Sequence, residues 1–179
     1  YQVTDTNNQV ATAALTPTVT PAPVGAPDTS RGEQGQSQVI APLGNDTTSG
    51  ASLDPGTVKL CLTGETSPNC TGTSNVPAMS GGSQVGSYTV NSDGTVSFTP
   101  TDPNFVGTLD AIGYQAADTT GQYAHANITV VVLPRPAPVA SPDANSAVYG
   151  TAVGFTPLIN DSAGSLPADS TSGNVTVKL

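Results

Sequence analysis

The sequence has few charged residues and very few basic ones. Lys and Arg account for 4 of the 179 residues and Asp and Glu for 13, which gives a formal net charge of −9. Only 9% of the residues are charged, whereas soluble domains average about 25%. Nucleic acids and anionic membranes are bound through clusters of Lys and Arg, so neither is an expected partner.

Long apolar runs are also absent. No stretch of the chain approaches the ~18 consecutive apolar residues that a membrane-spanning helix needs, so we expect no membrane insertion by this segment. No signal peptide or anchor is visible in the sequence. We expect such signals elsewhere in a longer parent protein.

Histidine and tryptophan are nearly missing, with 1 His and no Trp in the chain. His125 lies between Ala124 and Ala126, and this alternation predicts a surface position on a strand. No Ser-His-Asp set can be assembled around it. We therefore expect no catalytic residues and no enzyme activity.

Cysteine is limited to Cys61 and Cys70. The segment between them is rich in polar and turn-forming residues and predicts a surface loop. A disulfide across it would add roughly 2–3 kcal/mol on a chain-entropy basis. Two free thiols are the alternative. A structural zinc site lacks further ligands, and redox catalysis would favour a Cys-x-x-Cys motif, so no cofactor is expected.

The chain repeats itself with a period of roughly 115 residues, the size of a domain rather than of a solenoid unit. The recurring pairs are Tyr1–Thr6 with Tyr114–Thr119, Pro21–Val24 with Pro136–Val139, Pro42–Asp46 with Pro157–Asp161, and Val58–Leu60 with Val177–Leu179. His125 falls opposite Thr12 in this alignment, which weakens a chemical role for it further. We interpret residues 1–20 as the last strands of one repeat, 22–134 as a complete repeat and 137–179 as the first part of the next.

Short alternating runs between Gly- and Pro-rich turns predict about seven strands in the complete repeat. The clearest is a hairpin, in which Ser87–Val90 and Thr95–Thr99 flank a turn containing Gly94. The long run Tyr123–Leu133 predicts a further strand, whereas residues 63–84 read as an irregular loop. These features indicate an all-β protein with immunoglobulin-like β-sandwich domains in tandem.

Proline marks the expected joints between repeats, at Pro21–Pro23 and Pro134–Pro138. Proline fixes φ and favours extended polyproline II geometry. We therefore expect semi-rigid spacers that keep successive domains apart.

The order of motifs resembles the CshA-type fibril repeat of bacterial surface adhesins, and more broadly the cadherin-like tandem repeats of such adhesins. The residues that carry the resemblance are Val58–Cys61, Gly64–Thr71, Gly86–Val90, Asp93–Pro100, Phe105–Gly107 and Tyr114–Asp118. The resemblance implies a stalk or fibril repeat of a long, secreted, cell-wall-attached adhesin. Its partners would be neighbouring repeats and identical fibril chains, with host or bacterial surface ligands bound by another region.

Asp28, Asp46 and Asp118 are the candidate calcium ligands, because cadherin-like arrays use carboxylates to stiffen their joints and calcium takes six to eight oxygens. No Asp-x-Asp-x-Asp cluster is present. Asp and Asn also cap turns with their own side chains, and this second reading accounts for the same residues without a metal.

A binding module is the competing function. In that reading each domain would recognise a glycan or host protein through the 63–84 loop. Met79 is the only large apolar side chain of this segment besides valine, and the lack of aromatic residues there disfavours a sugar-stacking platform.

Overall fold

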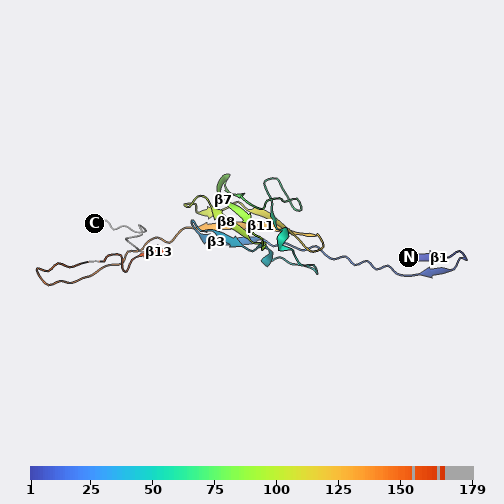
Figure 1. The fold of residues 1–179 in the computed structure, drawn as a ribbon, viewed down its shortest axis with the longest axis horizontal. Coiled ribbons are helices and arrows are strands. Elements are labelled where there is room, and N and C mark those ends of the chain that lie inside the picture. Colours follow the sequence, from blue (N-terminus) through green and yellow to red (C-terminus); the bar gives the residue numbers. More distant parts are fainter. Residues whose placement is uncertain (155, 165, 168–179) are drawn as a thin grey trace.

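Figure 1 shows the computed structural model, which describes residues 1–154, 156–164 and 166–167. The described chain is almost entirely strand and turn. Its helical content consists of two short 3-10 turns, η1 (Pro42–Gly44) and η2 (Pro55–Thr57). The all-β class predicted from the sequence is therefore confirmed. No helix in these residues is long and apolar enough to cross a membrane.

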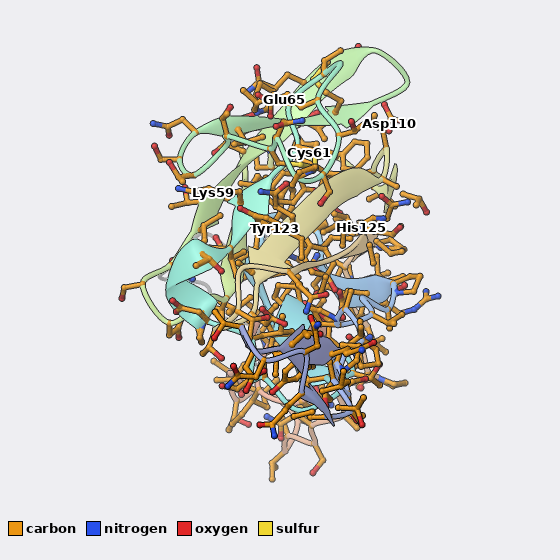
Figure 2. The ribbon with its side chains drawn as sticks, turned by 90° about the vertical axis from the view of Figure 1, so that its right-hand side faces the viewer. Lys59, Cys61, Glu65, Asp110, Tyr123 and His125 are labelled. Carbon is orange, nitrogen blue, oxygen red and sulfur yellow. A yellow bond between two sulfur atoms is a disulfide. The ribbon has the colours of Figure 1, made fainter. Side chains whose placement is uncertain are left out.

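One sheet has the strand order β3–β11–β10–β5, and β9 also pairs with β11. Strand β10 runs antiparallel to β11 and to β5, whereas β3 runs parallel to β11. The outer face of this sheet carries Lys59, Tyr123 and His125 (Figure 2). The strands are β3 (Asp28–Glu33), β5 (Lys59–Leu60), β9 (Gly107–Thr108), β10 (Ile112–Ala117) and β11 (Tyr123–Leu133).

The other sheet is antiparallel, with the strand order β4–β8–β7–β6. It contains the predicted hairpin, in which Tyr88 pairs with Phe98. Gly94 adopts φ +80° in the turn, a conformation that glycine adopts without a steric penalty. The strands are β4 (Gln38–Ile40), β6 (Val76–Ser80), β7 (Ser83–Val90) and β8 (Val96–Pro100).

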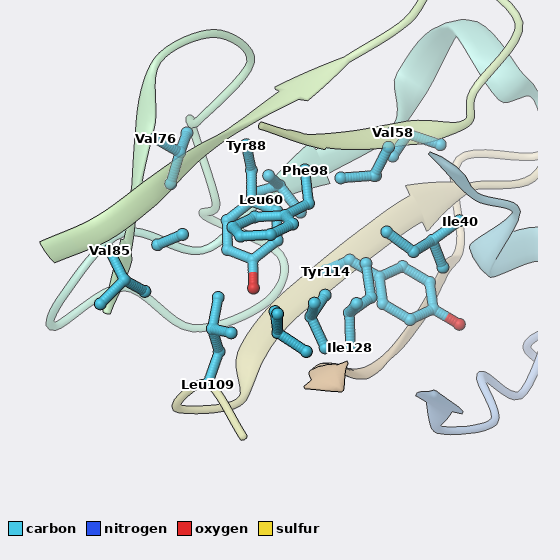
Figure 3. Close-up of a cluster of buried hydrophobic side chains, with 14 of the residues drawn as sticks. Ile40, Val58, Leu60, Val76, Val85, Tyr88, Phe98, Leu109, Tyr114 and Ile128 are labelled. Carbon is cyan, nitrogen blue, oxygen red and sulfur yellow. The ribbon is translucent and has the colours of Figure 1, made fainter. Parts of the chain in front are cut away.

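A single apolar core is built from the inward faces of both sheets (Figure 3). Its largest fully buried side chains are Tyr88, Phe98 and Tyr114. The rings of Tyr88 and Phe98 tilt against each other with centroids 5.7 Å apart, within the favourable range for aromatic pairs. Alternate residues of β11 supply the floor of the core, as the sequence pattern predicted: Ala124, Ala126, Ile128, Val130 and Val132.

The prediction of an irregular loop over residues 63–84 is wrong for its second half. Strand β6 and the start of β7 form a hairpin there, with Val76 opposite Tyr88 and a bulge between Ala78 and Met79. Strand β6 is short and contains Pro77, and its mostly apolar sequence lacks the alternation of apolar and polar residues that marks a strand. Pairing with the strongly patterned β7 compensates for this weak local preference.

Strand β3 was not predicted, because its sequence contains no apolar side chain. It forms by pairing in parallel with β11 from Asp28 opposite Ile128 to Glu33 opposite Leu133. The Ser30 hydroxyl donates to Oε1 of the buried Gln38 at 2.7 Å. Polar contacts between β3 and β4 thus replace the apolar contacts that usually mark a strand.

The N-terminal segment forms a hairpin of β1 (Gln2–Thr4) and β2 (Val10–Thr12). It has the same register as the β10–β11 hairpin, since Gln2 pairs with Thr12 as Gln115 pairs with His125. After the domain, β12 (Ser162–Ala163) pairs with β13 (Leu166–Pro167). The recurrence at Val177–Leu179 lies outside the described residues.

Replacing Gly86 by Ala should destabilise the domain by about 1–3 kcal/mol, the usual effect of overpacking a core. A Cβ at this position would lie 2.4 Å from Cε2 of Phe98 and 2.6 Å from the carbonyl oxygen of Thr99. The matched control is Gly44→Ala, because a Cβ there meets no atom within 4 Å. Urea unfolding of both variants checks this. Equal losses of stability would contradict the packing argument.

Candidate functional site

The Asn45–Asp46 loop binds the incoming chain at the N-terminal end of the domain. The backbone N–H of Ala26 donates to Asp46 Oδ1 at 2.8 Å, and Asn45 Nδ2 donates to the carbonyl oxygen of Pro27 at 3.1 Å. Val24 and Thr47 exchange two backbone hydrogen bonds of 2.9 Å. The segment that leads into β3 is thereby fixed to the domain over four residues.

Tyr114 connects this loop to the core. Its ring is fully buried, and its hydroxyl lies 2.7 Å from Asp46 Oδ1, 3.1 Å from the carbonyl oxygen of Pro42 and 3.2 Å from that of Ala26. A hydroxyl has one proton to donate, and the nearby charged carboxylate is its strongest acceptor. Burial and the Asp46 carboxylate raise the pKa of Tyr114 well above its usual value, which keeps the hydroxyl a donor.

Asp28 lies beside Asp46 at the start of β3. Burial, followed by repulsion from Asp46, raises the pKa of Asp28 from 3.8 to about 6. The Oδ2 atoms of both residues are buried and have no hydrogen-bond partner. Two carboxylates in such surroundings disfavour a second negative charge, so Asp28 carries its proton into the weakly acidic range.

Asp118 does not join the other two calcium candidates. It caps the β10–β11 turn, where its Oδ1 accepts hydrogen bonds from the backbone of Thr120 at 2.8 Å and of Gln122 at 2.9 Å. Across the part of the chain that the structure describes, no group of three or more His, Cys, Asp or Glu is placed to hold a metal ion. The structure thus brings together Asp28 and Asp46 only.

The same contacts recur in the flanking segments. Asp5 Oδ1 accepts from the backbone of Asn7 and Gln9, as Asp118 does in its own turn. Asp161 Oδ1 accepts from the backbone of Ser141 at 2.7 Å, as Asp46 does from Ala26. The repeated Asp residues therefore cap equivalent turns.

The disulfide expected between Cys61 and Cys70 is present. The loop it closes folds over the outer face of the β5–β10 pair and covers Gln115, which is only 3% exposed. Gln115 Oε1 accepts from the backbone of Cys70 at 3.1 Å, and its Nε2 donates to the carbonyl oxygen of Pro68 at 3.0 Å. Sequence reasoning missed Gln115, because a polar residue at an outward position gives no signal of burial.

Glu65 holds the two ends of this loop together. Its Oε2 accepts from the backbone of Leu62 at 2.8 Å and of Thr71 at 3.0 Å. Hydrogen bonds from the Thr71 hydroxyl and from these two backbone groups lower the pKa of Glu65. The loop contains no helix or strand, as predicted for the first half of residues 63–84, and these hydrogen bonds hold it in place.

A groove of about 750 Å³ lies beside the disulfide loop. Its walls come from the loop, from β6 and β7 and from the first part of β10 and β11, with Leu62, Met79, Tyr88 and Asp110 among the lining residues. Figure 2 shows Cys61, Glu65 and Asp110 at this end of the domain. Residues of the predicted 63–84 loop line the groove together with Tyr88 and with residues of 110–114 and 125–127. The sequence alone did not indicate that these segments lie together.

Replacing Tyr114 by Phe should lower the free energy of unfolding by about 1–3 kcal/mol. The Asp46 carboxylate then loses the hydrogen bond that the Tyr114 hydroxyl donates to it. Tyr123→Phe is the matched control, since Tyr123 is 38% exposed on the outer face of the sheet. Denaturant unfolding of the two variants gives the difference. If both variants lose the same stability, the Tyr114–Asp46 contact contributes nothing specific.

Asp28 should make stability depend on pH in the weakly acidic range. Its folded pKa of about 6 exceeds the ordinary 3.8, so its contribution is fully present below about pH 4 and is lost as the pH rises through about 6. Relative to the wild type, Asp28→Asn should therefore become progressively more stable between these limits.

Unfolding free energies at a series of pH values test the Asp28 prediction. The exposed Asp102 provides the control, and Asp102→Asn should keep the wild-type slope. Parallel profiles for the wild type and Asp28→Asn would show that Asp28 titrates normally.

The family model of the surface adhesin CshA repetitive domain matches residues 20–132. No curated protein matches the chain. The matched range contains both sheets, the Asn45–Asp46 loop and the disulfide loop.

Proposed function

The chain belongs to the family of the surface adhesin CshA repetitive domain, and from this premise we propose that it is a stalk repeat of a long adhesin. In this role the domain supplies reach for adhesion and aggregation. The family indicates an extracellular cell-surface protein, and we extend the proposal to a bacterial origin and to attachment at the cell wall. Host or bacterial ligands are bound by another region, and the partners of this segment are neighbouring repeats and identical fibril chains.

The observation that carries the proposal is the path of the chain through the domain. The incoming segment reaches the domain at the beginning of β11, where Gln122 donates to the carbonyl oxygen of Thr20. It then runs beside that strand, past the backbone of His125 at Gly25, and pairs with it in parallel from Asp28 opposite Ile128. The chain leaves after Leu133, at the other end of the same strand. With 11 residues at about 3.3 Å per residue, β11 separates the two points by about 36 Å. Figure 1 accordingly has β1 and β13 beyond opposite ends of the two sheets.

Both linkers are held where they meet the domain. Gln122 Nε2 in the β10–β11 turn donates to the carbonyl oxygen of Thr20 at 3.3 Å. At the other end, Arg135 donates to the carbonyl oxygen of Gln34 at 3.2 Å. Proline at 134, 136 and 138 restricts the outgoing chain further. These contacts favour a joint that transmits extension from one domain to the next.

We assign the repeat to the immunoglobulin-like β-sandwich class and the chain to a tandem array of such domains. Two sheets that share one core support the first assignment. The second is supported by the equal registers of the β1–β2 and β10–β11 hairpins and by the matching caps of Asp46 and Asp161.

The joint we propose needs no metal, and the domain acts without a cofactor or catalytic residues. Hydrogen bonds and proline supply its stiffness. A calcium-stiffened joint is the alternative, in which the two unpartnered Oδ2 atoms would face the ion.

Small-angle scattering of the 179-residue chain tests the stalk. We expect an elongated particle whose maximum dimension is the same with a chelator and with added calcium. Replacing Pro134, Pro136 and Pro138 together by Gly should shorten the mean dimension, because Gly-rich linkers behave as flexible coils. Pro103→Gly, in an exposed turn of the domain, is the control and should change nothing.

Two outcomes would contradict the metal-free stalk. A compact particle would argue against extension of the linkers. Lengthening on addition of calcium, abolished by Asp28→Asn, would favour the calcium-stiffened joint instead.

A further inference from the structure

The groove beside the disulfide loop has a chemical character of its own. Its ionisable lining residues are Glu65, Asp110, His125 and two tyrosines, and no Lys or Arg of the described chain lines it. The Glu65 carboxylate is already occupied by three hydrogen bonds within the loop. Asp110 is therefore the anionic group that remains for a ligand.

Asp110 is only partly engaged. Its Oδ1 accepts one long hydrogen bond of 3.3 Å from the backbone of Gly81, and no described residue donates to Oδ2. The side chain is exposed. A cation in the groove would find here an accessible carboxylate oxygen.

Tyr88 supplies the second polar group. Tyr88 is one of the residues that line the groove. It is 1% exposed, yet its hydroxyl has no hydrogen-bond partner. In Figure 3 this hydroxyl points to the side of the core where Leu109 lies, next to Asp110 in the chain. Burial and the Asp110 charge raise the pKa of Tyr88. A buried hydroxyl without a hydrogen-bond partner destabilises the protein. A ligand that offers this hydroxyl a hydrogen bond removes that penalty on binding.

The rest of the lining is largely apolar. Leu62, Val76, Met79 and Ile112 contribute hydrocarbon surface from the loop, β6 and β10. A lysine side chain matches this combination, because it has a four-carbon stem and a compact ammonium with three donors. The net charge of −9 also attracts a basic partner over longer distances.

We propose that this groove binds a lysine-bearing segment of a partner protein, with the stem against Met79 and Ile112 and the ammonium between Asp110 and the Tyr88 hydroxyl. Because that hydroxyl is buried in the free protein, a lining side chain must move to admit the ammonium. Met79 has three rotatable bonds and a half-buried position, which suits it to this movement. The domain then has a binding role in addition to its role as a stalk repeat.

Titration of the isotope-labelled 179-residue chain with a blocked pentapeptide of alternating alanine and lysine tests the proposal by NMR. Amide shifts should concentrate at Leu62, at Asp110–Gly113 and at His125. The matching alanine–glutamate peptide and a neutral chito-oligosaccharide should not bind. Asp110→Asn should weaken binding by about tenfold, whereas Asp54→Asn, an exposed acid outside the groove, should not.

Tyr88→Phe separates binding from folding. Phe keeps the ring and removes a hydroxyl that has no partner in the free protein, so stability should be unchanged or increased while lysine-peptide affinity falls. The proposal is overturned if the peptide fails to bind, or if Asp54→Asn weakens binding as much as Asp110→Asn, which would indicate diffuse attraction. It is also overturned if Tyr88→Phe leaves the affinity intact, or if the oligosaccharide binds the groove instead.

Discussion

One apolar core shared by two sheets is the constraint on which the rest of the structure depends. Each sheet has only one apolar face, and neither can bury it without the other. Tyr88 and Phe98 from one sheet meet Tyr114 and Ile128 from the other, and each such side chain contributes about 1.5–3 kcal/mol when fully buried. The linker contacts, the carboxylate pair and the groove all lie at the edges of this core and are positioned by it.

Two tyrosines of the core carry polar hydroxyl groups, those of Tyr114 and Tyr88. At one end, the Tyr114 hydroxyl reaches out of the core to Asp46 and joins the incoming chain to the domain. Tyr88 lines the groove, and its buried hydroxyl has no partner. Two tyrosines of one core thus have opposite roles, because one meets a carboxylate within the fold and the other meets none.

Much of the fold followed from sequence periodicity. The β7–β8 hairpin was predicted because Tyr88, Val96 and Phe98 alternate with polar residues around a glycine turn. Strand β3 was missed because its pairing with β11 is set by hydrogen bonds rather than by apolar side chains. Of the candidate site, the positions of Asp28 and Asp46 were singled out from the sequence. Their proximity, and the separate place of Asp118, depend on contacts between distant segments.

The sequence by itself determined the all-β class, because apolar and polar residues alternate locally. It also determined the repeat, because segments about 115 residues apart are similar, and the candidate disulfide, because the chain has two cysteines. Only the tertiary structure decided that Gln115 is buried beneath the disulfide loop, that burial and the neighbouring Asp46 raise the pKa of Asp28, and that Asp110 and Tyr88 line one groove. Each of these depends on desolvation or proximity between residues far apart in the chain. Such effects arise when the two sheets close on their common core.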